Sequence, residues 1–382
     1  MDKVRKGVSR RDFLSAGGLG IAGLAGFTGL RGLFSANKAA AKSQQSDEDD
    51  AHDHGNMGPV GQVNHTANEF DPHELLTDFD YGEVFEENGR SIRRWKMVAV
   101  DKEFEIAPGI FFPGWLYGSQ TSAASKRAGH IVGQCPGPTL RCVEGERLQI
   151  EFTNASSHPH TIHFHGIHSA FMDGSPGVGR GNINPGETFV YEFDAKPFGC
   201  HLYHCHALPL KRHIHKGLYG AFIIDPDPEK HSGEEQEKAK TRNHQYPENE
   251  NVHEMVMVMN GFDTNFDGDN EVYAVNSIAF AYGMNSPIKI NRDQLQRIYL
   301  VNLTEFDPIN SLHIHANFFD YYDHGTTLTP TLKTVDTIMQ CQAQRGIIEV
   351  SFAEFEPGLY MFHAHQSEFA ELGWMGFFEV VA

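Results

Sequence analysis

Short runs in which apolar and polar residues alternate fill most of the chain from about residue 90 onward. Each run follows residues typical of turns: Asn-Pro-Gly-Glu at 184–187 leads into the alternating run 188–193, and Glu-Pro-Gly at 356–358 leads into another apolar run. Such turn-then-alternation patterns are typical of β-strands. With 38 Gly, 18 Pro and few long helical periodicities, the pattern predicts an all-β chain rich in turns.

The order of these runs is repeated in the second half of the chain. Gly-Leu-Tyr-Gly-Ala-Phe at 217–222 matches Gly-Trp-Met-Gly-Phe-Phe at 373–378, and each follows a His-x-His sequence. We therefore expect two copies of one β-sandwich of roughly 130 residues. The expected organisation is an export signal (1–41), an acidic arm containing histidines (42–89), a first domain (90–228), a charged linker (229–250) and a second domain (251–382).

The N-terminus carries an export pattern. Ser-Arg-Arg-Asp-Phe-Leu at 9–14 is followed by a stretch rich in Gly, Ala and Leu and then by three alanines ending at Ala41. This is typical of a twin-arginine signal peptide cleaved near Ala41. A short membrane anchor is the alternative, but the many glycines and Arg31 make the stretch less apolar than a bilayer span requires. We expect a periplasmic or secreted protein without stable membrane insertion.

Composition narrows the choice of partners. The formal net charge of −19 argues against a nucleic acid partner. The chain has 23 histidines, which points to metal binding. The arm contains His52, His54, Met57, His65 and His73. Its histidines could capture metal, although a flexible or loosely docked tether is the simpler interpretation.

Four His-x-His pairs stand at matching places in the two halves. Because successive side chains of a strand point to opposite faces, the two histidines of each pair share one face, about 6.6 Å apart. That spacing lets one pair reach two neighbouring metal ions. The pairs are His163/His165, His204/His206, His313/His315 and His363/His365.

Cys205 lies between His204 and His206 and faces the opposite way, so its thiolate could hold another metal. A His₂Cys set with a weak or absent axial ligand is typical of a blue-copper electron-transfer site. Zinc is the alternative, but structural zinc sites use closely spaced Cys and His ligands in one compact module. The sequence favours copper.

These motifs resemble those of the multicopper oxidases, specifically their two-domain, laccase-like members, and more distantly the copper nitrite reductases. The stretches that carry the resemblance are 160–166, 204–206, 135–139 and 184–188. It covers nearly all of residues 90–382 and implies two cupredoxin-like domains, each a Greek-key β-sandwich.

The resemblance also implies the ligands of a type 1 copper in the first domain. They would be His160, Cys205 and His213, with Leu218 at the axial position and His215 as a competitor for the place of His213. The equivalent positions of the second domain lack a plausible ligand set, so one type 1 copper is expected per chain. Those positions are Asn310, Ala364, Phe369 and Trp374.

The four pairs would hold a trinuclear cluster, giving about four coppers per chain. By resemblance, His163 and His313 bind the type 2 copper, and the type 3 pair is bound by His165, His204, His206, His315, His363 and His365. Two-domain relatives build this cluster between neighbouring subunits, which implies a homotrimer. Asp173 and Cys205 would be the catalytic residues. Asp173 would deliver protons, and Glu368 and Glu371 are weaker candidates for that role.

The expected activity is one-electron oxidation of a small reducing substrate (a phenol, an aromatic amine or a metal ion), coupled to four-electron reduction of O₂ to water. A copper nitrite reductase is one alternative, which the extra histidines disfavour. A non-enzymatic copper carrier is another; the histidines of the arm favour it, but it does not explain the Cys205 arrangement.

Two features stay open. Cys135, Cys142, Cys200 and Cys341 could form disulfides in an exported protein or be buried free thiols. The acidic loop 263–269 imitates the first half of an EF-hand calcium loop, but Ala274 stands where a bidentate glutamate is required, so a polar loop is the simpler interpretation.

Overall fold

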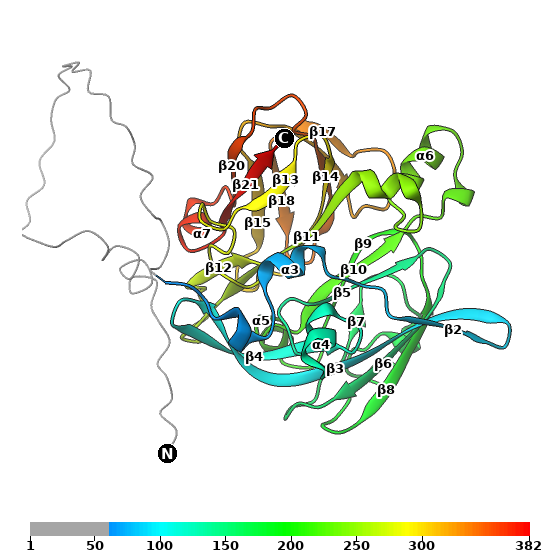
Figure 1. The fold of residues 1–382 in the computed structure, drawn as a ribbon. Helices are drawn as coiled ribbons and strands as arrows, with labels where there is room; N and C mark the ends of the chain where they lie inside the picture. The colour runs from blue at the N-terminus through cyan, green and yellow to red at the C-terminus, as the bar shows by residue number, and fades with distance from the viewer. Residues whose placement is uncertain (1–60) are drawn as a thin grey trace, which may run out of the picture.

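The computed structural model describes residues 61–382. The expected export signal (1–41) and the first part of the arm, including His52, His54 and Met57, lie outside the described residues. Within 61–382 the chain forms two β-sandwiches that pack side by side (Figure 1).

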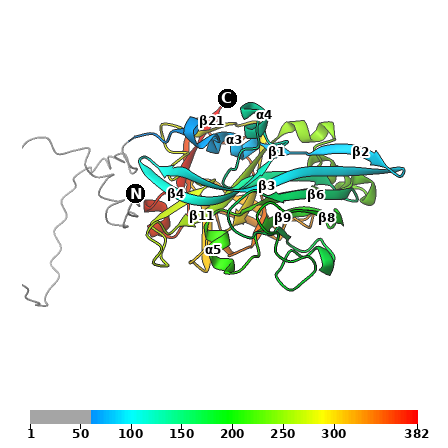
Figure 2. The same cartoon turned by 90° about the horizontal axis from the view of Figure 1, so that it is seen from below.

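The first sandwich consists of two sheets. One has the strand order β1-β5-β10-β9-β7, and the other has the order β2-β3-β6-β8 with β4 also paired to β3. The strands are β1 (Phe79–Asp80), β2 (Glu83–Glu87), β3 (Arg90–Ala107), β4 (Ile110–Ser119), β5 (Gly137–Val143), β6 (Arg147–Asn154), β7 (His163–Phe164), β8 (Thr188–Asp194), β9 (Gly199–His204) and β10 (Tyr219–Asp225). The short helices are α4 (Ala123–Ala128), η1 (Ala170–Met172) and α5 (Leu210–His215). Seen from below, α5 lies on the face opposite α4 (Figure 2).

The second sandwich also has two sheets, in the orders β12-β11-β14-β19-β16-β17 and β13-β21-β20-β15-β18. Its strands are β11 (Val252–Phe262), β12 (Val272–Val275), β13 (Ile288–Asn291), β14 (Leu295–Asn302), β15 (Ile309–Ile314), β16 (Phe319–Asp323), β17 (Leu332–Val335), β18 (Thr337–Cys341), β19 (Arg345–Val350), β20 (Gly358–His363) and β21 (Met375–Val381). One short helix, α7 (Ser367–Glu371), precedes the last strand.

The two sandwiches share one pairing scheme. In the first, β10 pairs in parallel with β5 and antiparallel with β9, which pairs antiparallel with β7. In the second, β21 pairs in parallel with β13 and antiparallel with β20, which pairs antiparallel with β15. The internal repeat expected from the sequence is therefore a repeat of topology, with β7 and β9 equivalent to β15 and β20.

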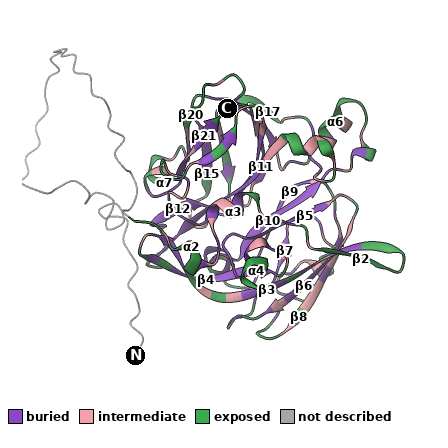
Figure 3. Ribbon diagram, viewed as in Figure 1, coloured by how far each residue is buried: buried purple, intermediate pink, exposed green. Residues whose placement is uncertain are grey.

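Where one face of a sheet is exposed to solvent, buried and exposed residues alternate as the apolar and polar residues do in the sequence. Along β13, Ile288 and Ile290 are buried while Lys289 and Asn291 are exposed. The central strands β9 and β10 are buried along their whole length, because each has protein on both faces (Figure 3). The histidine pairs thus begin on strands that the core holds rigidly.

The segment 61–89 differs from the flexible arm expected there. Helices α2 (His65–Asn68) and α3 (Pro72–Thr77) precede β1 and β2. Asp71 caps α3 by accepting a hydrogen bond from the His73 amide, and Phe70, Leu75 and Leu76 are buried in the core cluster that continues into the second domain. The expectation of a loose arm was wrong for this segment, because three apolar side chains within an acidic stretch are enough to dock it.

The segment expected to be a linker is also docked. It contains η2 (Pro228–Lys230), α6 (Glu234–Thr241) and η3 (Pro247–Asn251). The Arg242 side chain is 3% exposed and its guanidinium lies 3.9 Å from the centre of the Tyr322 ring in β16. The segment therefore packs along the second domain instead of spanning a gap.

A buried ionic network joins the two domains. Arg141 of β5 donates to Asp225 of its own domain (3.0 Å) and to Glu254 of β11 (2.6 Å). Arg297 donates to the other oxygen of Glu254 (3.0 Å) and to Glu349 (2.9 Å). All five side chains are mostly shielded from water, so the network orients the domains relative to each other. Among residues 61–382, no helix is long and apolar enough to cross a bilayer.

Candidate metal centres

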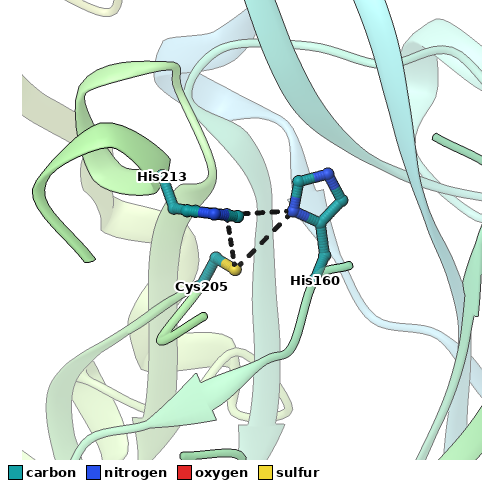
Figure 4. Close-up of side chains that lie close together, drawn as sticks. All are labelled: His160, Cys205 and His213. Atoms are coloured by element: carbon teal, nitrogen blue, oxygen red, sulfur yellow. Dashed lines mark hydrogen bonds between the residues drawn. The ribbon is translucent and has the colours of Figure 1, made fainter. Parts of the chain in front are cut away.

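Three side chains far apart in sequence meet beneath the surface of the first domain. Cys205 directly follows β9, His213 lies in α5, and His160 lies in an isolated bridge with Ile183. The Cys205 Sγ lies 3.3 Å from His213 Nδ1 and 3.8 Å from His160 Nδ1, and the two Nδ1 atoms are 3.1 Å apart (Figure 4). Both imidazoles thus present the same nitrogen to one point, together with a thiol. This is the donor set of a blue-copper site.

Electrostatics prepare this cluster for a cation. Burial lowers the pKa of His160 to about 3 and that of His213 to about 4, so both imidazoles are neutral and can act as ligands. Burial also raises the pKa of the Cys205 thiol to about 11. Without a cation the thiol keeps its proton, and metal binding must release it.

Further contacts fix the orientation of the three side chains. The Ser156 Oγ lies 2.7 Å from His160 Nε2, which leaves Nδ1 facing the cluster. The Thr161 amide donates to Cys205 Sγ (3.3 Å). Ser156 was not among the residues singled out from the sequence, since nothing in its local pattern distinguishes it from its neighbour Ser157.

Leu218 and His215 have different surroundings. Leu218 is fully buried; its carbonyl accepts the Cys205 amide (2.9 Å) and its amide donates to the His213 carbonyl (3.3 Å). The His215 ring lies among Phe112, Phe266 and Phe306, and its Nε2 accepts the Asp263 amide of the second domain (3.0 Å). The structure therefore brings His213 to Cys205 and directs His215 away from it.

The four paired histidines of the first domain form a second cluster. His165 Nε2 lies 2.9 Å from His204 Nε2, and the His163 ring lies 5.1 Å from the rings of His165 and His206. His163 Nδ1 donates to the Asp173 carbonyl (2.7 Å) and His204 Nδ1 donates to the Cys205 carbonyl (2.9 Å). With Nδ1 engaged, Nε2 of each ring is free for a metal.

The second domain holds a matching cluster. His315 Nε2 lies 3.0 Å from His363 Nε2, and the His313 ring lies 5.4 Å from those of His363 and His365. His313 Nδ1 donates to the Asp336 carbonyl (2.8 Å) and His363 Nδ1 to the Ala364 carbonyl (2.7 Å). His313 and His363 therefore have the same anchoring as their counterparts His163 and His204.

The two clusters differ in exposure. His315 and His365 are exposed, whereas His163, His165 and His206 are partly covered and His204 is buried. Within residues 61–382, every close group of potential ligands at these pairs draws its members from one domain alone. Each domain thus presents a cluster of its own.

Carboxylates lie beside both clusters. Asp173 Oδ2 is 3.8 Å from His163 Nδ1 and 4.0 Å from His168 Nε2. Asp336 Oδ2 stands in the same relation to His313, at 4.0 Å. His168 and Asp336 were not found from the sequence. Asp336 corresponds to Asp173 in the other repeat, but it follows its histidine by 23 residues where Asp173 follows by 10, so an alignment of the two motifs does not pair them. Glu368 and Glu371 lie on α7.

The cysteines and the acidic loop 263–269 are the remaining candidates from the sequence. All five cysteines are free thiols; Cys341 is exposed and the other four are buried. In the loop 263–269, the Asp263 carboxylate accepts the amides of Asp267 (3.1 Å) and Gly268 (2.8 Å), and carboxylate oxygens of Asp263, Asp267 and Glu271 lie within 4.8 Å of one another.

Comparisons with known proteins bear on the whole chain. The sequence profile described as "Multicopper oxidase" matches residues 117–229, and a second profile of the same description matches residues 237–382. A solved structure described as "Crystal structure of multicopper oxidase" is 51% identical, with a TM-score of 0.71, over 84% of this chain and 100% of that chain.

The chain belongs to the multicopper oxidases.

Other relatives define how far this membership reaches. Laccase 1 of Metarhizium acridum (strain CQMa 102) is 41% identical over 97 residues, 25% of this chain and 15% of that protein. Copper resistance protein A of Escherichia coli is 38% identical over 111 residues, 28% of this chain and 18% of that protein. The chain thus aligns with less than a fifth of the length of these curated relatives.

A copper nitrite reductase from Nitrosomonas europaea shares the fold, with a TM-score of 0.59 and 20% identity over 76% of this chain and 94% of that one. The two sandwiches are therefore cupredoxin-like domains in tandem, as the sequence predicted. Copper is the metal of the family, and the His and Cys clusters are compatible with it.

Proposed function

We propose that this multicopper oxidase takes single electrons from a small reducing substrate and delivers them to O₂, which is reduced to water. The observation that carries the proposal is the sequence His204-Cys205-His206. Cys205 Sγ points into the cluster with His160 and His213, while the rings of His204 and His206, 5.7 Å apart, point into the other cluster. A short covalent path thus links an electron-accepting site to a multinuclear one.

Separate groups of residues would bind the coppers and guide protons. His160, Cys205 and His213 would hold a type 1 copper beside Leu218, and the eight histidines of the four pairs would hold a type 2 copper and a type 3 pair. Bound copper supplies one-electron redox chemistry and an O₂-binding site. Asp173, whose pKa is lowered by hydrogen bonds from Ser175 and by His163 in spite of partial burial, holds a carboxylate within reach of His163. Because it stays ionised, it would guide protons toward the cluster by accepting hydrogen bonds from water, without storing a proton itself.

Oxygen uptake by copper-loaded protein tests this function. We expect about four coppers per chain, an intense blue colour and O₂ consumption with phenols or aromatic amines as donors. Nitrite reduction without O₂ uptake would establish a nitrite reductase instead. Copper binding with neither activity would establish a carrier.

We further propose that a complete trinuclear cluster needs two protomers. The support is the exposure of His315 and His365, which leaves the second-domain half of the set open to solvent. A heterologous contact that closes after three copies would bring each such half against the first domain of a neighbour, giving a homotrimer.

Mixing two inactive variants tests this assembly. His206→Ala removes a ligand from the first-domain half and His365→Ala removes one from the second-domain half. If clusters form between protomers, dissociating and reassembling the two together restores part of the activity, because some interfaces then pair two intact halves. Absence of any rescue, with both variants trimeric in sedimentation, would place both halves of each cluster within one chain.

We also propose export of the folded protein by the twin-arginine route, supported by residues 9–14 and by the need to load metal before transport. Replacing Arg10 and Arg11 by lysine should retain the protein in the cytoplasm, which fractionation would show.

A further inference from the structure

One aromatic side chain separates the candidate type 1 site from solvent. Trp115 lies in β4, is 6% exposed and was not singled out by its sequence. On its inner side the ring centre is 4.8 Å from that of His213 and 5.2 Å from that of His160. Trp115 therefore touches both imidazoles of the site at once.

The outer side of Trp115 is covered by two exposed side chains. The His158 ring lies 4.5 Å from the indole, and the Arg212 guanidinium lies 5.0 Å from its centre. A molecule resting on His158 or Arg212 is thus one aromatic ring away from the ligands of the site. The layers run from solvent through His158 and Arg212 to Trp115 and then to His160 and His213.

The backbone holds Trp115 in this position. Its residue pairs with Asp101 of β3, and its amide donates to the carbonyl of Lys216 (2.8 Å), which ends the helix that carries His213. The strand and the ligand-bearing helix are therefore tied together at this residue. Movement of the Trp115 backbone away from the end of α5 would break that bond.

We propose that Trp115 is the contact through which electrons enter the His160–Cys205–His213 site, from a neutral or anionic aromatic donor docked on His158, Leu208 and Arg212. This inference rests on the proposed function. In the step, the donor loses one electron and the metal of the site gains it; a phenolic donor releases its proton to water, and no bond to the protein forms or breaks. Electron transfer weakens steeply with the gap between partners, and a π-system in contact with both sides closes that gap.

The positive charge of Arg212 above the Trp115 ring determines whether the indole itself can be oxidised. A guanidinium over the face of an indole is attracted by its electron density and would be repelled by an oxidised, positively charged indole. Arg212 therefore opposes the formation of a tryptophan radical. Trp115 acts as a bridge and is not itself oxidised.

The same surroundings indicate the donor. Leu208 is 70% exposed, and its backbone hydrogen-bonds the His213 side chain, so an apolar surface adjoins the site. Arg212 and Lys216, whose ammonium lies 5.9 Å from the centre of the Trp115 ring, add positive charge beside it. The carboxylate of Asp101, which accepts the Ser157 amide (2.8 Å), also lies on this side and offsets part of this positive charge. An aromatic ring with a neutral or negative substituent finds both apolar and cationic contacts, whereas a metal cation meets Arg212 and Lys216 with one carboxylate between them, a net positive charge.

Anaerobic stopped-flow reduction of the blue band isolates this step, because it requires neither O₂ nor the trinuclear cluster. The probes are hydroquinonesulfonate, an anionic aromatic donor, and hexaammineruthenium(II), a cation that transfers electrons without ligation. For the sulfonate, Trp115→Leu should lower the limiting rate by about tenfold, or about 1.4 kcal/mol in the barrier, while Trp115→Phe should have a smaller effect. His158→Ala and Arg212→Ala should weaken donor binding by up to about tenfold with little change in the limiting rate.

Redox titration and fluorescence separate this role from a structural one. Cu(II) bound at the site should quench the fluorescence of Trp115 in wild type, and the quenched component should be missing in Trp115→Phe. Trp374→Phe, a buried tryptophan of the second domain, is the matched control and should leave the reduction rate unchanged. If Trp115→Leu does not fold, Trp115→Phe and the Arg212→Ala variant carry the test.

A Trp115→Leu protein with unchanged colour, potential and reduction rate would overturn the bridge. An Arg212→Ala protein in which reduction by the ruthenium cation slows as much as reduction by the sulfonate, or in which the dependence on sulfonate concentration is unchanged, would overturn the docking face. A wild type that is blue and readily reduced but consumes no O₂ would overturn the proposed oxidase and leave the role of Trp115 intact.

Discussion

The two domains place different residues at the same point of one scaffold. In the first domain the Cys205 amide donates to the Leu218 carbonyl (2.9 Å), and in the second the Ala364 amide donates to that of Trp374 (3.1 Å). The His206 amide donates to Thr161 Oγ1 (2.9 Å), as the amide of its counterpart His365 donates to Ser311 Oγ (2.8 Å). The backbone is thus the same where the side chains differ.

The second domain fills the place of a metal site with packing. Trp374 Nε1 donates to Asn310 Oδ1 (3.0 Å), and the Phe369 ring stacks on Tyr273 with centres 3.9 Å apart. Buried polar ligands without a metal would be left without partners, which is unfavourable. The Trp374–Asn310 hydrogen bond and the Phe369–Tyr273 stack leave no such polar group without a partner at these positions. The lesson is that this scaffold does not itself require a metal at the position; the side chains decide.

The largest effect should come from Cys205→Ser. The hydroxyl cannot supply thiolate-to-copper charge transfer, so we expect complete loss of the blue band in the visible spectrum, with copper at the His pairs retained. Ala364→Cys is the matched change in the second domain and should create no blue band, because Asn310 and Trp374 still occupy the site. A blue Cys205→Ser protein would refute the assignment of the first domain.

His365→Ala should come next. It removes one ligand from the exposed half of the set, and loss of a direct ligand should exceed the 10–100-fold cost typical of residues that only orient ligands, so O₂ uptake should fall by more than about 100-fold. The blue band should persist, because the first-domain site is untouched. Loss of both the colour and the activity would show that the two clusters are not separable.

Glu254→Gln tests whether the two domains are independent. Burial disfavours the charge of Glu254, but Arg141 and Arg297 outweigh burial and lower its pKa to about 2 from its ordinary 4.5. Because the folded-state pKa is depressed, the stability from this carboxylate is complete above pH 4.5 and is lost as the pH falls toward 2. The substitution should cost about 3–5 kcal/mol at neutral pH.

Urea unfolding at several pH values measures this effect. Wild type should lose stability steeply in that acidic window, and Glu254→Gln should show a shallower dependence. Equal pH dependence in the two proteins would mean that the network does not contribute as described.

Trp374→Phe should have a smaller effect. It removes the hydrogen bond to Asn310 and should reduce the free energy of unfolding by about 1–3 kcal/mol. Copper content and the blue band should not change, since the substitution lies in the domain without the Cys. A change in the visible spectrum would contradict the comparison between the two domains.

Leu218→Met should have the smallest effect on stability, below about 1.5 kcal/mol, because the side chains are similar in volume. A thioether donates weakly to copper and stabilises Cu(II) more than Cu(I), so the reduction potential should fall. Redox titration at the blue band provides the measurement. A shifted spectrum with a potential that rises or stays the same would contradict this account; no change in either would mean that Leu218 is not axial.

The sequence predicted those features that depend on local spacing. A two-residue period fixes which side of a strand the histidine pairs and Cys205 face, so their grouping within each domain follows from β9 and its counterpart. The tandem repeat was likewise visible as a repeated order of motifs.

Features that depend on long-range packing were not visible. Arg141 and Glu254 are distant in sequence, and nothing local pairs them across the two domains. Docking of residues 61–89 rests on Phe70 and two leucines within an acidic stretch. Ser156, Asp336 and Trp115 matter only because of what the fold places against them, and the choice of His213 over His215 depends on how α5 meets the second domain.

The ionic network between the domains has a consequence for the history of the chain. Once Arg141 of one repeat relies on Glu254 of the other, neither repeat can be exchanged for a homologous module without leaving a buried charge unpaired. A gene that arose by joining two copies thereby loses the freedom to shuffle them. Recombination between relatives should survive only when its crossover points carry both partners together, so chimeric proteins joined between the domains should need matched arginine and glutamate positions to accumulate in soluble form.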